Sequence, residues 1–496
     1  MSTTVEAEAT EGGTVNDGNL KTAQAQTFKK GFCSVRHGLA LIVHLCNFSI
    51  STQRINMSIA LPAMVNNTAP PTLLNASIER PPTESQDNWN ETLKEVKAVA
   101  ALYDWSPEIQ GIILSSPNYI SFLAPIPCGY VAEMFGVKYL ISAGLLITSV
   151  LDLFIPQAAD TGVTLLIVLR IIQGTVQVII LTSQYSIWTR WAPPLERSQL
   201  ITISVSGSVL GSCITLFIGG FLCQNLGWPY TFYIFGAIGC LCSFLWFAFV
   251  YDDPMNHPFI STSEKEYIIS SLAQEDSPPG WSLPIKPVIK SLPLWSILVF
   301  SFTEDWHCFV MASYTPTYIS SVLKVNIRDS GILSALPYLS GCICIVLGGL
   351  LADFLLSRNI LRLNTIRKLF TLMGVFIPST LCVCLFWVRS SFSATMTFLI
   401  LSFAFKSLAQ SGALINFMDI APRHGALLRG VSQIFTYLAG AFSPTVAGFL
   451  ISQDSEFGWR NVFLLSFAMS MAGLVFYLIF GQAEVQDWAK QTFTYF

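Results

Sequence analysis

Five charged residues lie inside segments of this sequence that are otherwise apolar or only mildly polar. They are Arg54 in 37–65, Arg170 in 161–188, Glu304 and Asp305 in 292–318, and Lys406 in 392–419. A charge at membrane depth is costly unless it is partnered or hydrated, so such residues usually have a function. At a rise of about 1.5 Å per residue, all five fall near the middle of a membrane. Guanidinium groups there could bind a carboxylate or a phosphate, because they present fixed hydrogen-bond donors.

Polar residues recur around these charges at steps of three and four, which is the spacing of one helix face. The four stripes are His44, Asn47, Ser51, Arg54 and Ser58; Arg170, Gln173, Gln177 and Gln184; Ser301, Glu304, His307 and Met311; and Ser402, Lys406 and Gln410. Several aromatic residues lie near the stripes and could stack on flat organic anions. These are Phe48, Tyr119, Phe122, Tyr185, Trp306, Phe309 and Tyr314.

A purely structural role is the alternative for each of these residues. Arg54 and Arg170 could pair with Glu304, Asp305 or backbone carbonyls and only join helices. For Lys406, an ion pair with Glu304 or Asp305 is as plausible as contact with a ligand. Single histidines in a span, such as His44 and His307, more often make structural hydrogen bonds, and single aromatics more often pack between helices.

The elements that would position these residues are membrane-spanning helices. Only 11% of the 496 residues are charged and 52% are hydrophobic, whereas about 25% of the residues of a soluble domain are charged. Twelve segments are long enough to cross a hydrocarbon core of about 30 Å. They are 37–65, 108–132, 138–156, 161–188, 200–223, 228–251, 292–318, 330–356, 366–388, 392–419, 430–452 and 459–481.

Charge and glycosylation signals predict the orientation. Lys and Arg are in excess on the side of the two termini, which predicts that both are cytosolic. The segment 66–107 carries acceptor sequons at Asn66, Asn75 and Asn90, which are usable only on the outer or lumenal side. Residues 1–30 have no apolar stretch typical of a signal peptide. The cysteines indicate neither a disulfide framework nor a metal site.

The spans form two related sets of six. A polar linker at 252–291 separates a bundle at 37–251, which follows a tail at 1–36, from a bundle at 292–481, which precedes a tail at 482–496. Segments that begin at Gly111 and Gly331 match at a constant offset. The matched pairs are Pro117 with Pro337, Gly129 with Gly349, Ala132 with Ala352, and Glu133 with Asp353. Two parallel six-helix halves with a substrate path between them are expected.

Two short motifs support the division of the chain into two related six-helix halves. The segment "GYVAEMFGVK" (129–138) resembles the motif between spans 2 and 3 of the major facilitator superfamily, and "GGLLADFLLSR" (348–358) resembles its weaker repeat. The motif residues are Gly129, Glu133, Gly136, Lys138, Gly349, Asp353 and Arg358. The acids could cap or pair with a neighbouring helix end and hold the halves in one state. Met134 stands where that motif usually has a basic residue.

Further segments narrow the resemblance. "MVNNT" (64–68), "RIIQG" (170–174), "WAPPLERS" (191–198), "SLPLW" (291–295) and "DIAPR" (419–423) are similar to the solute carrier 17 family of sodium/phosphate cotransporters, sialin and vesicular glutamate transporters. Over much of its length the chain looks closest to the intestinal sodium/phosphate-cotransporter-like branch. The resemblance implies that spans 1, 4, 7 and 10 line a central cavity. Gln177, Leu114 and Glu304 replace a glutamate, a histidine and an arginine of the glutamate or sialate carriers, which disfavours tight proton coupling.

The sequence therefore predicts an all-α membrane protein of twelve helices with a site for organic anions, and the resemblance implies that these are similar to urate, hippurate or iodothyronines and that inorganic phosphate is also carried. A proton-coupled carrier of acidic sugars or amino acids is one alternative, and a receptor or scaffold is another. No catalytic motif of an enzyme occurs, and no nucleic-acid partner or cofactor is expected; dependence on Na⁺ or Cl⁻ stays open. We expect a functional monomer in the apical plasma membrane of epithelial cells. The C-terminal "TYF" (494–496) fits recognition by a PDZ domain.

Overall fold

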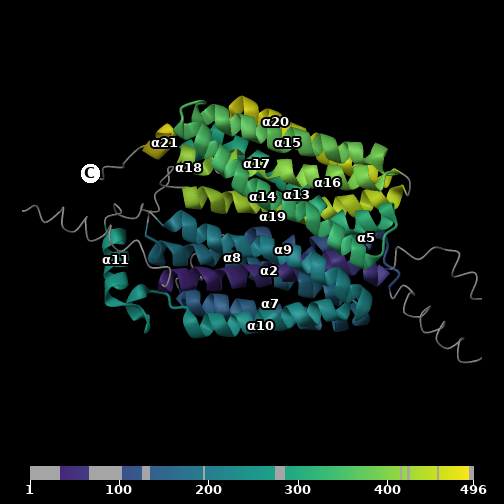
Figure 1. The fold of residues 1–496 in the computed structure, drawn as a ribbon, viewed down its shortest axis with the longest axis horizontal. Helices are drawn as coiled ribbons and strands as arrows, with labels where there is room; N and C mark the ends of the chain where they lie inside the picture. Colours follow the sequence, from purple (N-terminus) through teal and green to yellow (C-terminus); the bar gives the residue numbers. More distant parts are fainter. Residues whose placement is uncertain are drawn as a thin grey trace, which may run out of the picture.

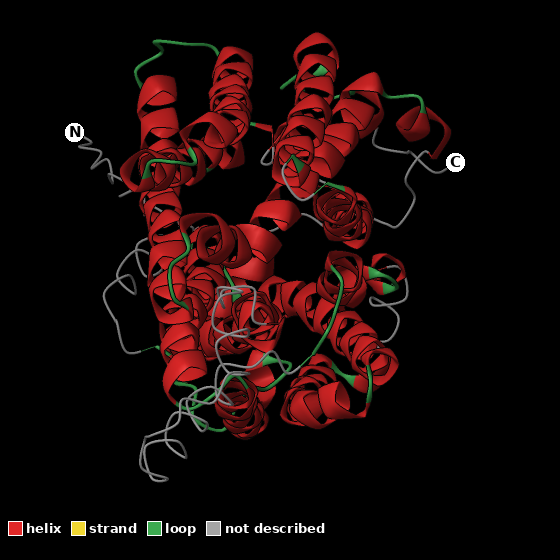
Figure 2. Ribbon diagram, turned by 90° about the vertical axis from the view of Figure 1, so that its right-hand side faces the viewer, coloured by secondary structure: helices red, strands yellow, loops and turns green. Residues whose placement is uncertain are grey.

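The computed structural model describes residues 34–65, 103–125, 134–193, 196–273, 285–413, 416–421, 425–454 and 457–490. These residues form helices joined by short loops and contain no β-strand (Figure 2). The prediction of an all-α protein is confirmed for this part of the chain. The sequons at Asn66, Asn75 and Asn90, the motif residues Gly129 and Glu133, and the C-terminal "TYF" lie outside the described residues.

The long helices fall into two groups that lie side by side (Figure 1). We call the first group the N-half: α2 (Val35–Val65), α5 (Pro107–Ser115), α7 (Val137–Thr161), α8 (Val163–Trp191), α9 (Arg197–Asn225) and α10 (Pro229–Phe249). We call the second group the C-half: α13 (Leu292–Leu323), α14 (Ile327–Ser357), α15 (Leu363–Val388), α16 (Phe392–Lys406), α19 (Gly425–Gln453) and α20 (Gly458–Phe480). Between them in sequence are η4 (Pro254–Asn256), α11 (Thr262–Ala273) and α12 (Ile285–Ile289).

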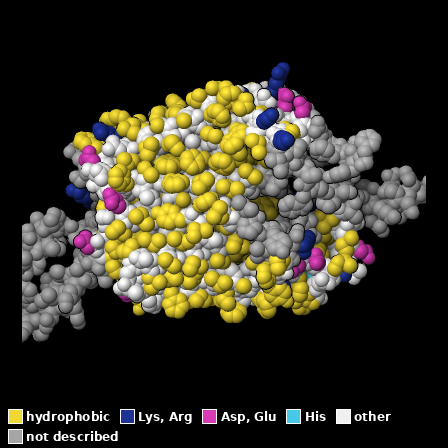
Figure 3. All heavy atoms as spheres, turned by 180° about the vertical axis from the view of Figure 1, so that it is seen from behind, with side chains coloured by type: hydrophobic (Ala, Val, Ile, Leu, Met, Phe, Trp, Pro, Cys, Tyr) yellow, Lys and Arg dark blue, Asp and Glu magenta, His cyan; other side chains and the backbone are white. Residues whose placement is uncertain are grey.

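The outer surface suits a hydrocarbon environment. Nine of the described helical stretches are long and apolar enough to cross a membrane, including α7 to α10 and α14. In the view of Figure 3 the face is dominated by hydrophobic side chains, and charged side chains lie toward its two ends. The helices α2 and α13 have 31 and 32 residues but are outside this set, and they carry polar residues at membrane depth.

The second predicted span is not one continuous helix. Helix α5 ends at Ser115, and the short 3₁₀ turns η2 (Ser116–Asn118) and η3 (Ser121–Leu123) follow it. Pro117 lies in the first turn, and proline lacks the N–H that a continuing α-helix needs. The prediction of an unbroken helix over 108–132 is therefore wrong within the described residues.

The tenth predicted span, 392–419, is also interrupted. Helix α16 ends at Lys406, and α17 (Leu408–Ser411) and α18 (Asn416–Ile420) are single short turns. Arg367 of α15 stabilises this interruption, because its Nη1 donates to the carbonyl of Ser411 at 2.6 Å and its Nε lies 2.7 Å from Asp419 Oδ2. A side-chain donor thus satisfies a carbonyl that the helix end leaves free.

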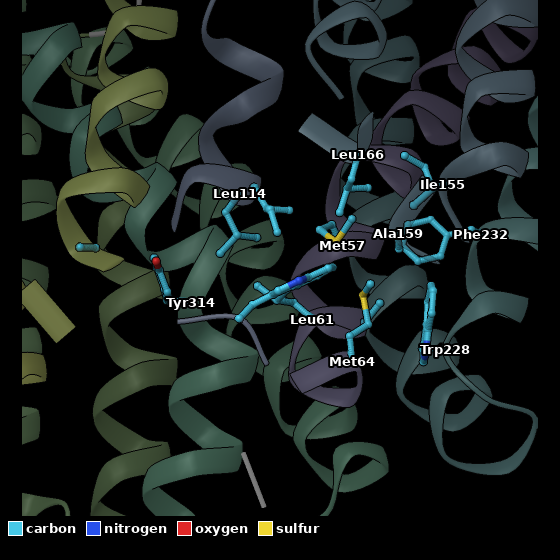
Figure 4. Close-up of a cluster of buried hydrophobic side chains, with 14 of the residues drawn as sticks. Met57, Leu61, Met64, Leu114, Ile155, Ala159, Leu166, Trp228, Phe232 and Tyr314 are labelled. Carbon is cyan, nitrogen blue, oxygen red and sulfur yellow. The ribbon is translucent and has the colours of Figure 1, made fainter. Parts of the chain in front are cut away.

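The halves pack together at the end remote from Val35 and α21 (Asp487–Lys490), which we call the distal end. A hydrophobic cluster there includes Met57, Leu61 and Met64 of α2, Leu114 of α5 and Tyr314 of α13 (Figure 4). At the same end the Ser115 and Thr445 hydroxyls lie 2.5 Å apart. A Cβ added to Gly448 of α19 would come within 2.4 Å of the Pro107 carbonyl oxygen, so this contact between halves requires glycine.

At the opposite end, which we call the terminal end, α11 is fastened to the N-half. Glu264 of α11 accepts hydrogen bonds from the backbone N–H groups of Val35 and Arg36 at 3.1 and 3.3 Å. The buried Arg36 side chain pairs with Glu196 at 2.7 Å and with Glu264 at 3.5 Å. The carboxylate caps the start of α2, because helix N-termini have free N–H groups and favour negative charge.

The end of the first motif, at the start of α7, also contacts a carboxylate. Gly136 has φ of 75°, a conformation that favours glycine. The N–H of Lys138 donates to Asp252 Oδ1 at 2.7 Å, so Asp252, just after α10, caps the start of α7. The Lys138 ammonium lies 3.7 Å from the centroid of the Tyr251 ring.

Candidate functional site: buried arginines between α2, α7 and α8

Arg54 projects from the middle of α2 toward α8 and the C-half. Its Nε donates to Gln177 Oε1 at 3.0 Å, and its guanidinium carbon lies 5.7 Å from the centroid of the Tyr437 ring. Its Nη2 is buried and has no hydrogen-bond partner in the described structure. Arg54 is therefore held by a neutral amide and an aromatic ring, and no acid among the described residues forms an ion pair with it.

Arg170 of α8 lies deeper and is only 2% exposed. Its Nε and Nη1 are buried without a hydrogen-bond partner among the described residues. Arg170 interacts electrostatically with Arg54 and with Asp152 of α7, although Asp152 forms no direct ion pair with it within the described part of the chain. Two guanidinium groups with free donors thus face one region of the N-half.

Asp152 is a buried acid that the sequence analysis overlooked. It is 0% exposed and accepts hydrogen bonds from Asn56 at 3.0 and 3.1 Å and from Gln173 at 3.1 Å. The list of five charges within spans is therefore incomplete. The signal was present in the sequence, because Asp152 stands inside the predicted span 138–156.

Amides connect Arg54 to the rest of this region. Gln177 donates to Gln53 Oε1 at 3.3 Å, and Gln53 in turn donates to Ser149 Oγ at 2.9 Å. Gln53, Gln173 and Gln177 are each at most 1% exposed. A buried network of satisfied polar groups fixes side-chain positions, so it can hold the arginines in place for a ligand.

Part of the predicted stripe on α2 points elsewhere. His44 Nδ1 lies 2.9 Å from the Ile203 carbonyl oxygen, and Asn47 Nδ2 donates to the Ser204 carbonyl at 2.9 Å. A Cβ on Gly211 would lie 3.1 Å from Ser51 Cβ, so Ser51 also faces α9. These three residues join α2 to α9, and they are separated from the face that carries Gln53 and Asn56.

The C-half charges are partnered. Lys406 Nζ lies 2.5 Å from Glu304 Oε1 in an ion pair whose side chains are 17% and 6% exposed. Asp305 Oδ2 accepts a hydrogen bond from Thr436 Oγ1 at 2.5 Å. The alternative that Lys406 pairs with an acid of α13 is therefore the observed arrangement, and the pair joins α16 to α13.

Four further predicted residues lie at separate places in the two halves. Tyr119 OH lies 2.9 Å from Thr445 Oγ1, and Trp306 packs in the distal cluster. His307 is buried with its Nε2 3.9 Å from Cys382 Sγ, which places it inside the C-half. Tyr185 on α8 is 45% exposed. None of these four contacts Arg54 through an interaction recorded in the described structure.

The repeated motif of the C-half is described only in part. Gly349 lies in α14 with open space around the position of a Cβ, and Arg358 follows the end of that helix, with its guanidinium carbon 5.9 Å from the Phe354 ring centroid. The side chain of Asp353 lies outside the described residues.

Comparison with known proteins agrees with this architecture. A model of the Major Facilitator Superfamily matches residues 43–426. The chain is 68% identical over 496 residues, all of both chains, to a human protein named "Probable small intestine urate exporter". It is 53% identical over 461 residues to the mouse sodium-dependent phosphate transport protein 3, covering 93% of this chain and 96% of the relative.

A solved structure shares the fold at low sequence identity. The bacterial homologue of the human lysosomal transporter Spinster, in an inward-facing and occupied conformation, superposes with a TM-score of 0.67 at 15% identity, over 90% of this chain and 97% of that one. The predicted fold of two six-helix halves is thereby confirmed. The chain belongs to the major facilitator superfamily and, within it, to the solute carrier 17 family of sodium-dependent phosphate transport proteins and the urate exporter.

Proposed function

We propose that this protein transports organic anions similar to urate, hippurate or iodothyronines, and inorganic phosphate, by alternating access around Arg54 and Arg170. One observation carries the proposal: half-buried Arg54 and buried Arg170 have buried N–H donors that find no hydrogen-bond partner among the described residues, inside the N-half of a transporter fold. A carboxylate, an enolate-type oxyanion or a phosphate oxygen can accept from such donors. The names of the two relatives support these substrate classes.

The charge balance of the site favours an anion over a neutral solute. Arg54 contacts neutral Gln177, whereas Lys406 is neutralised by Glu304. Asp152 offsets part of the Arg170 charge from within the network. The N-half therefore offers net positive charge at the interface, and the C-half offers an ion pair that needs no ligand. We infer that the substrate contacts are Arg54 and Arg170, supported by Gln173 and Gln177, with Tyr119, Tyr185 and Trp306 as more distant candidates.

The packing of the halves at the distal end supports the proposal of alternating access. The distal end is closed by the Met57 and Leu114 cluster and by the Gly448 contact with Pro107. In our proposal the bundles 37–251 and 292–481 rotate about the central site, and α11 of the linker 252–291 moves with the N-half through Glu264. The Asp252 contact at Lys138 holds the motif in the present state. Transport then requires that the distal contacts break and reform.

Several finer statements belong to the same proposal. We place the protein in the apical plasma membrane of epithelial cells, as a monomer with cytosolic termini, glycosylated at Asn66, Asn75 and Asn90. The C-terminal "TYF" is a candidate ligand for a PDZ domain. No catalytic activity is proposed, because the buried residues serve binding. A proton-coupled carrier of acidic sugars is disfavoured by Gln177, which places an amide beside Arg54 where the proton-coupled relatives have a glutamate.

The test is uptake into proteoliposomes of labelled urate, p-aminohippurate, an iodothyronine and phosphate, with Na⁺, Cl⁻, pH and membrane voltage set separately. Arg54→Gln and Arg170→Gln should reduce anion uptake by about 10- to 100-fold, the scale of a lost charge-assisted hydrogen bond. The matched control is Arg190→Gln, in the same helix as Arg170, because Arg190 is 43% exposed and pairs with Asp253 at 3.5 Å.

Uptake measured with Na⁺, Cl⁻, pH and membrane voltage varied one at a time identifies the driving force. A requirement for Na⁺ indicates symport, whereas uptake that follows voltage alone indicates facilitated anion movement, since one charge crossing 100 mV is worth about 2.3 kcal/mol. If Arg54→Gln and Arg170→Gln fold normally and transport every anion at the rate of Arg190→Gln, the proposed site is wrong.

A further inference from the structure

Tyr437 belongs to the C-half but packs against the N-half. It lies in α19 and is 5% exposed. It packs in a small hydrophobic cluster with Ala124 and Phe122, from the second predicted span, and with Val178 and Ile179 of α8. A C-half ring is therefore buried against the N-half, next to Arg54.

The ring lies against the Arg54 guanidinium. The guanidinium carbon lies over the Tyr437 ring at 5.7 Å from its centroid, within the range of a cation–π contact. The N–H donors of a guanidinium point outward in its plane, along its edge. Along that edge Nε is bonded to Gln177, and Nη2 is buried without a partner in the described structure.

An anion that binds the edge of Arg54 must therefore lie next to the ring. A bidentate acceptor lies in the plane of the guanidinium, since the donors form a planar fork. A planar ligand held in that plane extends alongside the Tyr437 ring and can stack on it or meet its edge. A tetrahedral phosphate has no flat surface and gains nothing from the ring.

We propose that Tyr437 is a specificity-determining residue, which makes the Arg54 site prefer organic anions with an aromatic ring over saturated or inorganic anions. The inference rests on the proposed function, because it assumes that Arg54 binds the transported anion. To the proposed function the inference adds a preference of the site for aromatic organic anions. It also assigns to the C-half one direct role in recognition, although the charged part of the site lies in the N-half.

The experiment compares two acylglycines, one with a 4-aminophenyl ring and one with a saturated ring. Competition for uptake is measured with p-aminohippurate, with cyclohexanecarbonylglycine, which has the same acylglycine carboxylate on a saturated ring, and with inorganic phosphate. The variants are Tyr437→Leu and Tyr437→Phe. The matched control is Phe435→Leu, because Phe435 is in the same helix but packs against Trp295, at a centroid distance of 6.2 Å, inside the C-half.

Tyr437→Leu should raise the inhibition constant of p-aminohippurate roughly two- to twelvefold, the scale of an aromatic pair. The constants of the saturated analogue and of phosphate should stay within about twofold of wild type, and Tyr437→Phe and Phe435→Leu should match wild type for all three ligands. An equal change for both acylglycines, no change for either, or a Tyr437→Phe effect as large as that of Tyr437→Leu contradicts the proposal.

The two proposals fail in different ways. If wild type takes up none of these anions, or if Arg54→Gln has no effect on uptake, the proposed function is wrong and the role of Tyr437 falls with it. If uptake depends on Arg54 but the preference for the aromatic acylglycine is unchanged in Tyr437→Leu, the transport function stands and only the role of Tyr437 is refuted.

Discussion

Arg54 Nε donates to Gln177 Oε1 at 3.0 Å, which links the middle of α2 to the middle of α8 through an arginine and a neutral amide. The amide orients the guanidinium without cancelling its charge. A carboxylate in the same place would form an ion pair with Arg54 and compete with any anionic substrate for its donors. In the proposed function, this pair therefore keeps the charge of Arg54 available to an anion.

Gln177→Glu should weaken anion uptake by neutralising Arg54. At pH 7.4 the new carboxylate pairs with Arg54, so we expect anion uptake to fall about tenfold, which corresponds to the loss of one charge-assisted contact. The measurement is initial uptake at pH 7.4, with Gln184→Glu in the same helix as the control. Uptake by Gln177→Glu at the rate of Gln184→Glu would contradict this prediction.

The ion pair of Lys406 and Glu304 should contribute more to stability than an exposed pair. Its side chains are 17% and 6% exposed, so Lys406→Met leaves a buried carboxylate without its partner and should destabilise the protein by about 3 kcal/mol. The double variant Lys406→Met with Glu304→Leu should lose less stability than Lys406→Met alone, because it leaves no buried charge without a partner. Thermal unfolding in detergent measures both.

The exposed pair of Arg190 and Asp253 provides the comparison. Its side chains are 43% and 48% exposed, and Arg190→Met should cost less than about 1 kcal/mol. If Lys406→Met and the double variant lose the same stability, the packing of the lysine side chain stabilises the protein and the ion pair does not.

The contact of Gly448 with Pro107 should be required for closure of the distal end. The methyl group of Gly448→Ala would lie 2.4 Å from a carbonyl oxygen, 3.0 Å from Gly111 Cα and 3.0 Å from the Tyr314 hydroxyl, so α19 and α5 must move apart. We expect uptake to fall at least about tenfold while binding of labelled anion is retained, because the central site is remote from this contact. Gly430→Ala, in the same helix with nothing within 4 Å, is the control. Normal uptake by Gly448→Ala would exclude the contact as a gate.

His257 should make the terminal end less stable in acid. Its Nδ1 accepts from the Phe259 N–H at 3.2 Å, and its Nε2 lies 3.3 Å from the Phe249 carbonyl oxygen, which suits the neutral ring. Burial lowers the pKa of His257 below its ordinary value of 6.5, against a smaller opposing effect of the Phe249 carbonyl. Because the folded state disfavours the proton, stability is present above pH 6.5 and is lost as the pH falls below it.

The measurement is the apparent melting temperature of wild type and His257→Asn between pH 5 and 8. The wild-type curve should fall more steeply below pH 6.5 than the curve of His257→Asn, since only wild type must bind the extra proton on unfolding. Parallel curves would assign the acid sensitivity to other groups.

The class of the protein and the positions of its charges could be predicted from the sequence. Low charge content and recurring apolar segments exclude a soluble fold, because the backbone must be hydrogen-bonded internally in lipid and long apolar helices achieve this. The matched segments from Gly111 and Gly331 predicted the two halves, and isolated polar residues within spans pointed to Arg54 and Arg170. Helix breaks after Ser115 and Lys406 were missed, since their causes are proline geometry and a distant arginine.

The partners of each charge were decided only by the tertiary structure. Spacing of three and four residues defines a helix face, but not the neighbour that the face meets. His44 and Asn47 therefore bind α9, whereas Gln53 and Asn56, a part of a turn away, meet Ser149 and Asp152 of α7. Contacts between residues far apart in sequence, such as Arg54 with Gln177 and Tyr437, depend on how whole helices cross, and that is set by the packing of every side chain along them.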